Sequence, residues 1–153
     1  MGFKFVSTND LSLVPEAVAK FEEIGRVVSV EQTSEKIFAE LADCDAYFTG
    51  CGVRIDDDFL DHAPNLKLIG SPHTGRDHLD LDAIERRGIT LFHIAEEYEL
   101  LNSFTATSEL TFGLLLSIVR KIPKAIETAN SGLWAWENFI GFQLSGKTMG
   151  ILG

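Results

Sequence analysis

The stretch that decides the fold is LKLIGSPHTGRDHLDLDAIERRGITLFHI, residues 66–94. It begins with the apolar run 66–70, continues through a turn of small residues and a polar helical segment, and ends with the apolar run 89–94. Strands that are apolar on both faces and separated by a helix are typical of a parallel sheet covered on both sides. The stretch therefore predicts a strand–helix–strand unit of an α/β domain.

The residues before this stretch repeat the same alternation. Apolar runs predict three further strands at 3–7, 26–30 and 46–50, and helical patterns lie at 11–25, 33–44 and 56–64. Gly25 is a candidate C-cap of the first helix, and Thr33 or Ser34 is a candidate N-cap of the second. Five strands alternating with helices predict a flavodoxin-like parallel sheet flanked by helices.

The turn after the fourth strand, GSPHTG at 70–75, is the most informative one, because such sheets bind ligands beyond the carboxyl ends of their strands. Its small residues allow backbone amides to point outward as an anion-binding nest, which suits a carboxylate. Asp77 or Asp80 could cap the helix that follows, and Gly88 could end it. On these residues alone, a purely structural turn is the commoner alternative.

The composition restricts the partners. The 153 residues carry a formal charge of −10 and a pI near 4.7, without a Lys/Arg cluster, which argues against nucleic acid and anionic membranes. No apolar run approaches the roughly 20 residues that span a bilayer, and the first ten residues do not resemble a signal peptide. Cys44 and Cys51 form no CxxC motif and are expected to be reduced thiols. These features predict a cytoplasmic protein without a metal site.

A long helix is predicted over 105–122. Glu109 lies near its positive end, and Pro123 lies just past its last turn. Its middle has almost no polar face, so the pattern predicts a helix buried between layers. The polar residues at its start, Thr105, Thr107 and Ser108, suit N-terminal capping.

Three segments in the same order, 66–94, TATSELTFGLLLSIVRKIPKA (105–125) and SGLWAWENFIGFQLSGKTMGILG (131–153), resemble the D-isomer-specific 2-hydroxyacid dehydrogenases. This family includes phosphoglycerate dehydrogenase, formate dehydrogenase and glyoxylate reductase. The resemblance covers 66–153, whereas the first 60 residues match only in their strand–helix rhythm. It implies an oxidoreductase that transfers a hydride between C2 of a small 2-hydroxy or 2-keto acid and NAD.

The resemblance also implies site residues. His73, Thr74 and Gly75 take the positions whose backbone amides hold the substrate carboxylate, and Thr74 and Thr107 lie near the cofactor. The family commonly has Gly where this chain has His73, whose side chain could narrow the pocket, add a donor or point to solvent. Arg76 is compatible with an anionic substrate and equally with a salt bridge to Asp77 or Asp80.

By the same resemblance, GKTMGILG (146–153) is the first strand of an NAD-binding domain, and Gly153 is the first glycine of its G-x-G-x-x-G motif. Residues 1–100 then form the substrate domain, and 101–153 form interdomain helices and the start of the cofactor domain. The catalytic Arg, Glu and His are expected downstream of Gly153, so the chain alone is expected to be inactive. None of the four histidines fills that vacancy, and His78 and His93 are expected to be structural.

Alternative functions stay open. The chain could act by itself as a small-carboxylate-binding or subunit-interaction module, because its apolar helix and Trp134, Trp136 and Phe139 favour association. The resemblance likewise implies a homodimer. A nucleotide or flavin binder is disfavoured, because STNDLS (7–12), after the first strand, contains no glycine.

Overall fold

The computed structural model describes residues 2–152 of the 153-residue chain. It divides into two compact units, Met1–Leu101 and Asn102–Gly153. The first unit contains the predicted sheet, and the second is helical.

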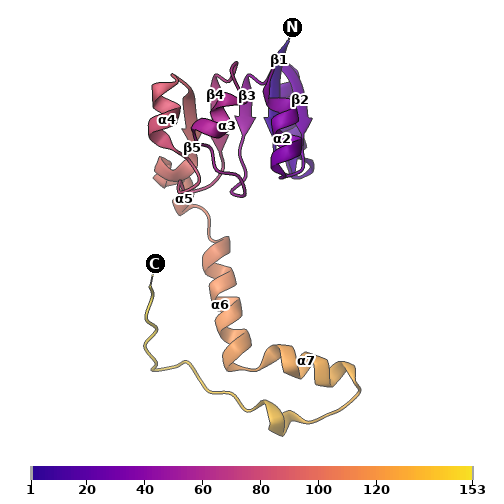
Figure 1. Cartoon of the computed structure of the whole chain (residues 1–153). Helices are drawn as coiled ribbons and strands as arrows, with labels where there is room; N and C mark the ends of the chain where they lie inside the picture. The colour runs from indigo at the N-terminus through magenta and orange to yellow at the C-terminus, as the bar shows by residue number, and fades with distance from the viewer. Residues whose placement is uncertain (1, 153) are drawn as a thin grey trace. The chain divides into compact units, whose positions relative to one another are not determined.

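The first unit is built on a five-stranded sheet in which all strands are parallel (Figure 1). The strands are β1 (Phe3–Ser7), β2 (Gly25–Ser29), β3 (Ala46–Phe48), β4 (Leu68–Ser71) and β5 (Thr90–His93). Their order, β2-β1-β3-β4-β5, is that of flavodoxin. Each predicted strand is present, and its ends differ from the prediction by at most two residues. The predicted α/β fold is confirmed.

The helices of this unit are short. They are η1 (Leu11–Leu13), α1 (Pro15–Glu22), α2 (Ser34–Leu41), α3 (Asp57–Asp61), α4 (Leu81–Arg86), η2 (Ile94–Glu96) and α5 (Tyr98–Asn102), where η marks a 3₁₀ helix. The predicted helix 11–25 is thus split into η1 and α1. The split lies at Pro15, which lacks an amide hydrogen and suits the first position of a helix.

The core lies on one face of the sheet. Val6, Tyr47 and Ile69 are neighbours in the strand register and are fully buried against α2, α3 and α4. On the opposite face, the Phe21 ring of α1 packs against Phe5 and Phe48, with ring centroids 5.0 and 4.9 Å away. The helices therefore cover both faces, as the apolar strands require.

The predicted caps of α2 and α4 can be compared with the structure. Thr33 occupies the N-cap position of α2, but its side chain makes no capping hydrogen bond. Asp80, rather than Asp77, caps α4 by accepting a hydrogen bond from the Ala83 amide at 2.9 Å. Gly88 follows α4 with a φ of 68°, a conformation that favours glycine.

The prediction that Gly25 caps a helix is wrong. Helix α1 ends at Glu22, and Gly25 is the first residue of β2, paired with Phe3 of β1. A Cβ atom on Gly25 would lie 2.0 Å from the Phe3 carbonyl oxygen. The glycine is needed because the two strands approach closely, and a local pattern does not reveal this.

The second unit contains α6 (Ala106–Val119), α7 (Ile122–Asn130) and η3 (Trp136–Phe139). Residues 147–152 have no regular secondary structure, although a strand was predicted there. A strand is stabilised by hydrogen bonds to a neighbouring strand, and no described residue pairs with this segment. Gly153 lies outside the described residues. Within residues 2–152, no helix has both the length and the apolarity to cross a membrane.

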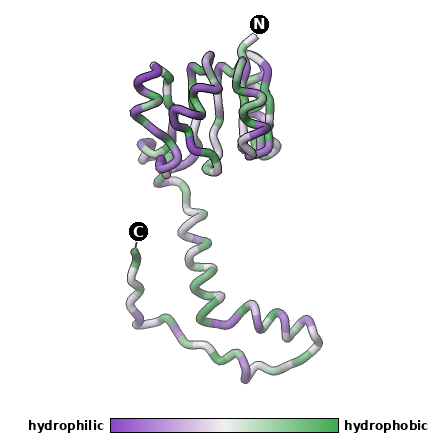
Figure 2. Tube along the Cα trace, in the orientation of Figure 1, coloured by the Kyte–Doolittle hydropathy of each residue, from purple (hydrophilic) through white to green (hydrophobic). Residues whose placement is uncertain are grey.

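The prediction that the long apolar helix is buried is wrong for this chain. Apolar residues are distributed along α6 (Figure 2), yet Val119 alone among its residues is buried. Leu110, Leu114 and Ile118 are exposed, the last by 75%. Because the apolar residues lie on all sides of α6, contacts with the other elements of its own unit cannot cover them.

A buried charge links β1 to α2. Lys4 is 6% exposed, and its Nζ atom donates to Glu40 Oε2 at 2.8 Å and pairs with Asp43. Burial alone would lower the pKa of Lys4, but hydrogen bonds to Asp43 and Glu40 outweigh it and raise the pKa. The same contact lowers the pKa of Asp43.

Substituting Lys4→Met should remove this charge and keep an apolar stem. We expect the free energy of unfolding at pH 7 to fall by roughly 1–2 kcal/mol, because Glu40 and Asp43 lose charge-assisted hydrogen bonds. Urea denaturation measures it. The control is Lys36→Met, which breaks the exposed Lys36–Glu31 pair and should change stability by less than about 0.5 kcal/mol. Equal losses in both variants would contradict a special role for Lys4.

Substituting Gly25→Ala should destabilise the sheet by roughly 3 kcal/mol, because the new methyl group collides with the Phe3 carbonyl. In Gly113→Ala, the matched control, the methyl group meets open space in the middle of α6 and should stabilise that helix by about 1 kcal/mol. Thermal and urea unfolding compare the two. An unchanged stability of Gly25→Ala would show that the two strands can separate at no cost.

Candidate functional site

The candidate site lies at the edge of the sheet where the parallel strands end. The loops after β1 and β3 are joined there. The Gly50 amide donates to Thr8 Oγ1 at 2.8 Å, and Asn9 Nδ2 donates to the Thr49 carbonyl at 3.1 Å. These bonds hold the loops after β1 and β3 together next to the turn after β4.

The turn between β4 and α4, residues 72–79, is anchored at its far end. The Leu79 amide donates to the Arg76 carbonyl at 2.9 Å. The Ile55 amide donates to the His78 carbonyl at 2.8 Å, and the Asp80 amide donates to the Ile55 carbonyl at the same distance. The loop before α3 therefore holds the second half of the turn in place.

The backbone amides of residues 73–78 donate no hydrogen bond to a described residue, and those of the first half are the ones predicted to bind substrate. The amides of His73, Thr74 and Gly75 donate none of the hydrogen bonds that the described residues make. Thr74 and Gly75 are exposed, so an outside acceptor can reach them. Three successive free donors at the carboxyl edge of a parallel sheet form an arrangement that suits an anion. His73, Thr74 and Gly75 thus lie at this edge of the sheet, and their role in holding a carboxylate stays a prediction.

Polar side chains without partners surround this turn. Four buried side-chain atoms in the described part of the chain have no hydrogen-bond partner: Ser71 Oγ, His73 Nε2, His78 Nε2 and His93 Nδ1. Ser71 and His93 are neighbours in the β4–β5 register, and they line a pocket of about 350 Å³. Buried polar atoms without a hydrogen-bond partner are rare, so four of them at one edge of the sheet favour this edge as a functional site.

Sequence reasoning missed this cluster. His78 and His93 look structural when read singly, since one follows a turn and the other ends a strand. Burial lowers the pKa of His78, and the neighbouring His73 ring lowers it further, against an opposing effect of Asp77. The signal that could have found the cluster is the presence of a polar residue at the end of each of two adjacent strands.

Arg76 does not pair with Asp77 or Asp80, the two alternatives that the sequence left open. Its Nη1 atom lies 3.3 Å from Oε1 of Glu96, in the segment after β5. His93 Nε2 lies 4.0 Å from the same oxygen. Glu96 therefore links the turn to the exit of β5, across 20 residues of sequence.

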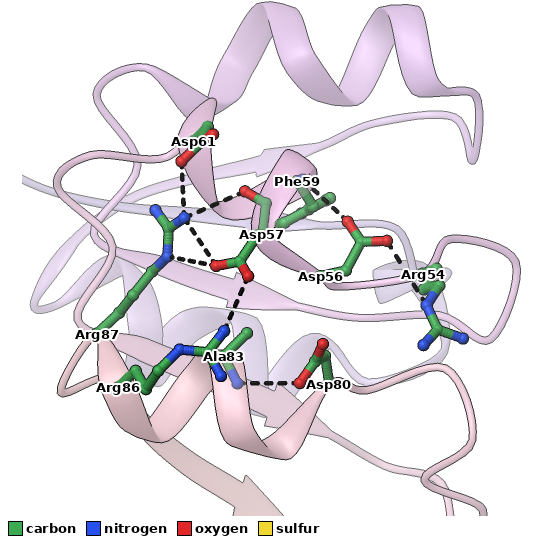
Figure 3. A network of polar contacts seen from close by, with 9 residues as sticks. All are labelled: Arg54, Asp56, Asp57, Phe59, Asp61, Asp80, Ala83, Arg86 and Arg87. Atoms are coloured by element: carbon green, nitrogen blue, oxygen red, sulfur yellow. Dashed lines mark hydrogen bonds and ion pairs between the residues drawn. The ribbon is translucent and has the colours of Figure 1, made fainter.

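A second set of ion pairs fixes α4, which follows the turn (Figure 3). Asp57 accepts hydrogen bonds from Arg86 at 2.8 Å and from Arg87 at 3.0 Å, and Arg87 also reaches Asp61 at 2.7 Å. Hydrogen bonds from Arg87 lower the pKa of Asp57. These contacts join α3 to the C-terminal end of α4, the end away from the turn, and they do not involve the free amides.

The remaining predicted residues lie elsewhere. Thr107 is exposed in the first turn of α6, in the second unit, and its carbonyl accepts from Thr111 Oγ1 at 2.8 Å. Thr105 is the N-cap residue of α6, but its hydroxyl bonds to Glu109 Oε1 at 2.6 Å instead of a backbone amide. Within residues 2–152, no group of three or more metal-ligating side chains occurs.

The two cysteines have opposite surroundings. Cys44 is fully buried, its Sγ atom lies 3.1 Å from the Ala46 carbonyl, and burial raises the pKa of its thiol to about 12. Cys51 is exposed, in the loop after β3 at the candidate site. Both are free thiols, as predicted.

Comparison with known sequences identifies relatives of the chain. It is 35% identical to human D-3-phosphoglycerate dehydrogenase over 121 residues, 79% of this chain and 22% of that protein. It is 32% identical to D-3-phosphoglycerate dehydrogenase of Methanocaldococcus jannaschii over 90% of this chain and 26% of that protein. Glyoxylate reductase of Pyrococcus furiosus is 33% identical over 78% of this chain and 36% of that protein. The chain thus spans about a quarter to a third of these curated relatives.

Solved structures share the fold. D-lactate dehydrogenase from Aquifex aeolicus, complexed with NAD and lactic acid, matches with a TM-score of 0.71 at 20% identity, over 92% of this chain and 41% of that one. An acyclic imino acid reductase in complex with NADPH and D-arginine matches with a TM-score of 0.70, also at 20% identity, over 93% of this chain and 46% of that one.

A family model gives the assignment. The catalytic domain of the D-isomer specific 2-hydroxyacid dehydrogenases matches residues 6–100, which include the last two residues of β1, the whole of β2 to β5 and the turn with the free amides. Together with the curated relatives, this match shows that the chain belongs to the D-isomer specific 2-hydroxyacid dehydrogenase family.

Proposed function

We propose that the chain supplies the substrate domain of an NAD-dependent dehydrogenase that interconverts a small 2-hydroxy acid and the corresponding 2-keto acid. The observation that carries the proposal is the turn 72–79, which presents the free amides of His73, Thr74 and Gly75 at the ligand edge of the sheet. A 2-hydroxy acid offers a carboxylate to these donors. Family membership supplies the reaction class.

In this proposal the turn binds and orients the substrate. Charge-assisted hydrogen bonds from the three amides hold the carboxylate, and this fixes the direction in which C2 points. NAD supplies the hydride chemistry when it is bound. Thr74 and Thr107, which are both exposed, would border the nicotinamide, and Gly153 would belong to the pyrophosphate loop.

We further propose that these 153 residues bind a carboxylate but do not transfer hydride by themselves. The support is their coverage: they correspond to 22% of the human relative and to 41% of the D-lactate dehydrogenase chain. The domains would then divide into 1–100 for substrate and 101–153 for the connection to the cofactor domain.

A second function, subunit interaction, is favoured by α6. Leu110, Leu114 and Ile118 lie four residues apart on one side of this helix, and all three are exposed. Exposed apolar stripes of this kind mark interaction surfaces. We propose a homodimer in which a second copy covers this row, and the dimer is compatible with the dehydrogenase proposal.

The carboxylate proposal can be tested on backbone amides. In Gly75→Pro one donor is lost, so glycolate should bind about 10–100 times more weakly, the equivalent of one hydrogen bond to a charged group. NMR titration of the 153-residue chain, following the amides of 73–78, gives the affinity. NADH with glyoxylate should be turned over by neither the parent chain nor the variants.

Gly75→Ala is the matched control. It keeps the amide, and its methyl group would meet only the flexible carboxylate of Asp77 at 3.1 Å. Melting temperatures show whether each variant is folded. Equal glycolate affinity of the folded Pro and Ala variants would refute the amide site, and turnover by the parent chain would refute the proposed inactivity.

The dimer proposal predicts that Leu114→Glu weakens self-association at least tenfold, because a charge would be buried in the contact. Analytical ultracentrifugation across a range of protein concentrations measures the dissociation constant. Ala129→Glu places the same charge at an exposed position of α7 and should leave association unchanged. A parent chain that stays monomeric at high concentration would exclude this dimer.

A further inference from the structure

Two histidines of the substrate turn form a pair. The rings of His73 and His78 lie 5.9 Å apart, centroid to centroid, with an edge-to-face angle of 78°. The Nε2 atoms of both are buried and have no hydrogen-bond partner in the described chain. His78 is only 7% exposed, so water does little to satisfy its ring. The pair therefore lies next to the free amides with unused capacity to hold a proton.

The surroundings of this pair disfavour the protonated, charged form of His78. Burial lowers the pKa of His78, and so does the proximity of His73, because two imidazolium rings at this separation repel each other. A proton on one ring therefore disfavours a proton on the other. Without a bound anion, a doubly protonated pair is therefore disfavoured.

The charged groups on the neighbouring elements are mostly engaged with one another. Arg76 is paired with Glu96, which also lies 4.0 Å from His93 Nε2 at the exit of β5. In the loop bridged to His78, Arg54 Nε lies 3.5 Å from Asp56 Oδ2. Asp80 is occupied in capping α4. Asp77 is thus the anionic residue within the turn that favours a proton on His78.

We propose that binding of a carboxylate to the free amides of the turn is coupled to the uptake of one proton by the His73–His78 pair. The inference rests on the proposed function of the turn. A carboxylate held by the amides of 73–75 would bring a negative charge beside both rings, and that charge favours an imidazolium ring over a neutral one. The proton comes from solvent and binds to an imidazole nitrogen, so the bound anion is neutralised locally.

This coupling makes affinity depend on pH in a defined direction. An anion that raises the proton affinity of the pair is itself bound more tightly once the pair is protonated, because the linkage is reciprocal. Affinity is therefore greatest below the pKa of the unliganded pair and falls as pH rises through the interval up to the pKa of the liganded pair. Within that interval, one proton per anion corresponds to about a tenfold loss of affinity per pH unit.

The test is an NMR titration of the full 153-residue chain with sodium glycolate between pH 5.5 and 8.5. The turn amides report binding, and the imidazole nitrogen resonances report the protonation of each histidine. The expected result is that glycolate shifts the titration of His73 or His78 to higher pH and that its dissociation constant rises with pH. An affinity that does not change with pH would overturn the coupling.

Two variants separate the pair from the other titrating groups. The double variant His73→Gln/His78→Gln removes both rings of the pair but keeps every backbone amide of the turn, and it should reduce the pH dependence of glycolate affinity at least threefold. His62→Gln removes an exposed histidine that stacks on Phe38 and bonds to the Asp58 carbonyl, and it should keep the full dependence. A dependence that survives in the folded double variant would assign the proton to another group and reject the proposal.

The outcomes also distinguish this inference from the function on which it rests. Glycolate binding at the turn without a pH dependence would refute the proton coupling and leave the carboxylate site standing. No shift of the 73–78 amides at any pH, even at saturating glycolate, would refute the carboxylate site and the coupling together.

Discussion

The structure depends on one row of buried side chains that crosses the sheet. Val6, Tyr47 and Ile69 lie side by side on β1, β3 and β4 and face the helices. Because successive residues of a strand point to opposite faces, a shift of one residue in any of these strands would move its member of the row to the other face of the sheet. The row therefore fixes the register, and the register brings the loops that follow the three strands to a common edge.

Local patterns predicted what is decided locally. The strands could be predicted as short apolar runs. Gly88 could be predicted as the residue that ends α4, and the N-cap of α4 could be narrowed to Asp77 or Asp80. Contacts between distant segments could not be read in this way. Gly25 is needed because of the Phe3 carbonyl on another strand, Arg76 meets Glu96 beyond the next strand, and the unpaired atoms around the turn become visible only when two strand ends are adjacent. The exposure of α6 was mispredicted because an apolar sequence indicates that a helix should be buried but does not indicate which segment or chain buries it.

The net negative charge of the chain disfavours the approach of anions, whereas the candidate site is proposed to bind one. A chain with a formal charge of −10 repels anions at long range, and yet its proposed substrate is an anion. Under the proposals above, the turn would bind the anion through uncharged donors, the backbone amides, and beside histidines whose protonation the bound anion favours. Its one arginine is engaged with Glu96. Under this view, binding relies on short-range geometry, and the field of the protein contributes little to capture.

The contrast between the two cysteines has a practical consequence for anyone who handles this protein. A thiol must ionise to react, so burial silences Cys44 as long as the sheet is intact, whereas Cys51 is accessible in the folded state. An alkylating probe should thus attach first to a single position, at the edge where substrate is proposed to bind. Any later labelling of Cys44 requires the core to open. The rate of this second alkylation therefore reports how often the core opens.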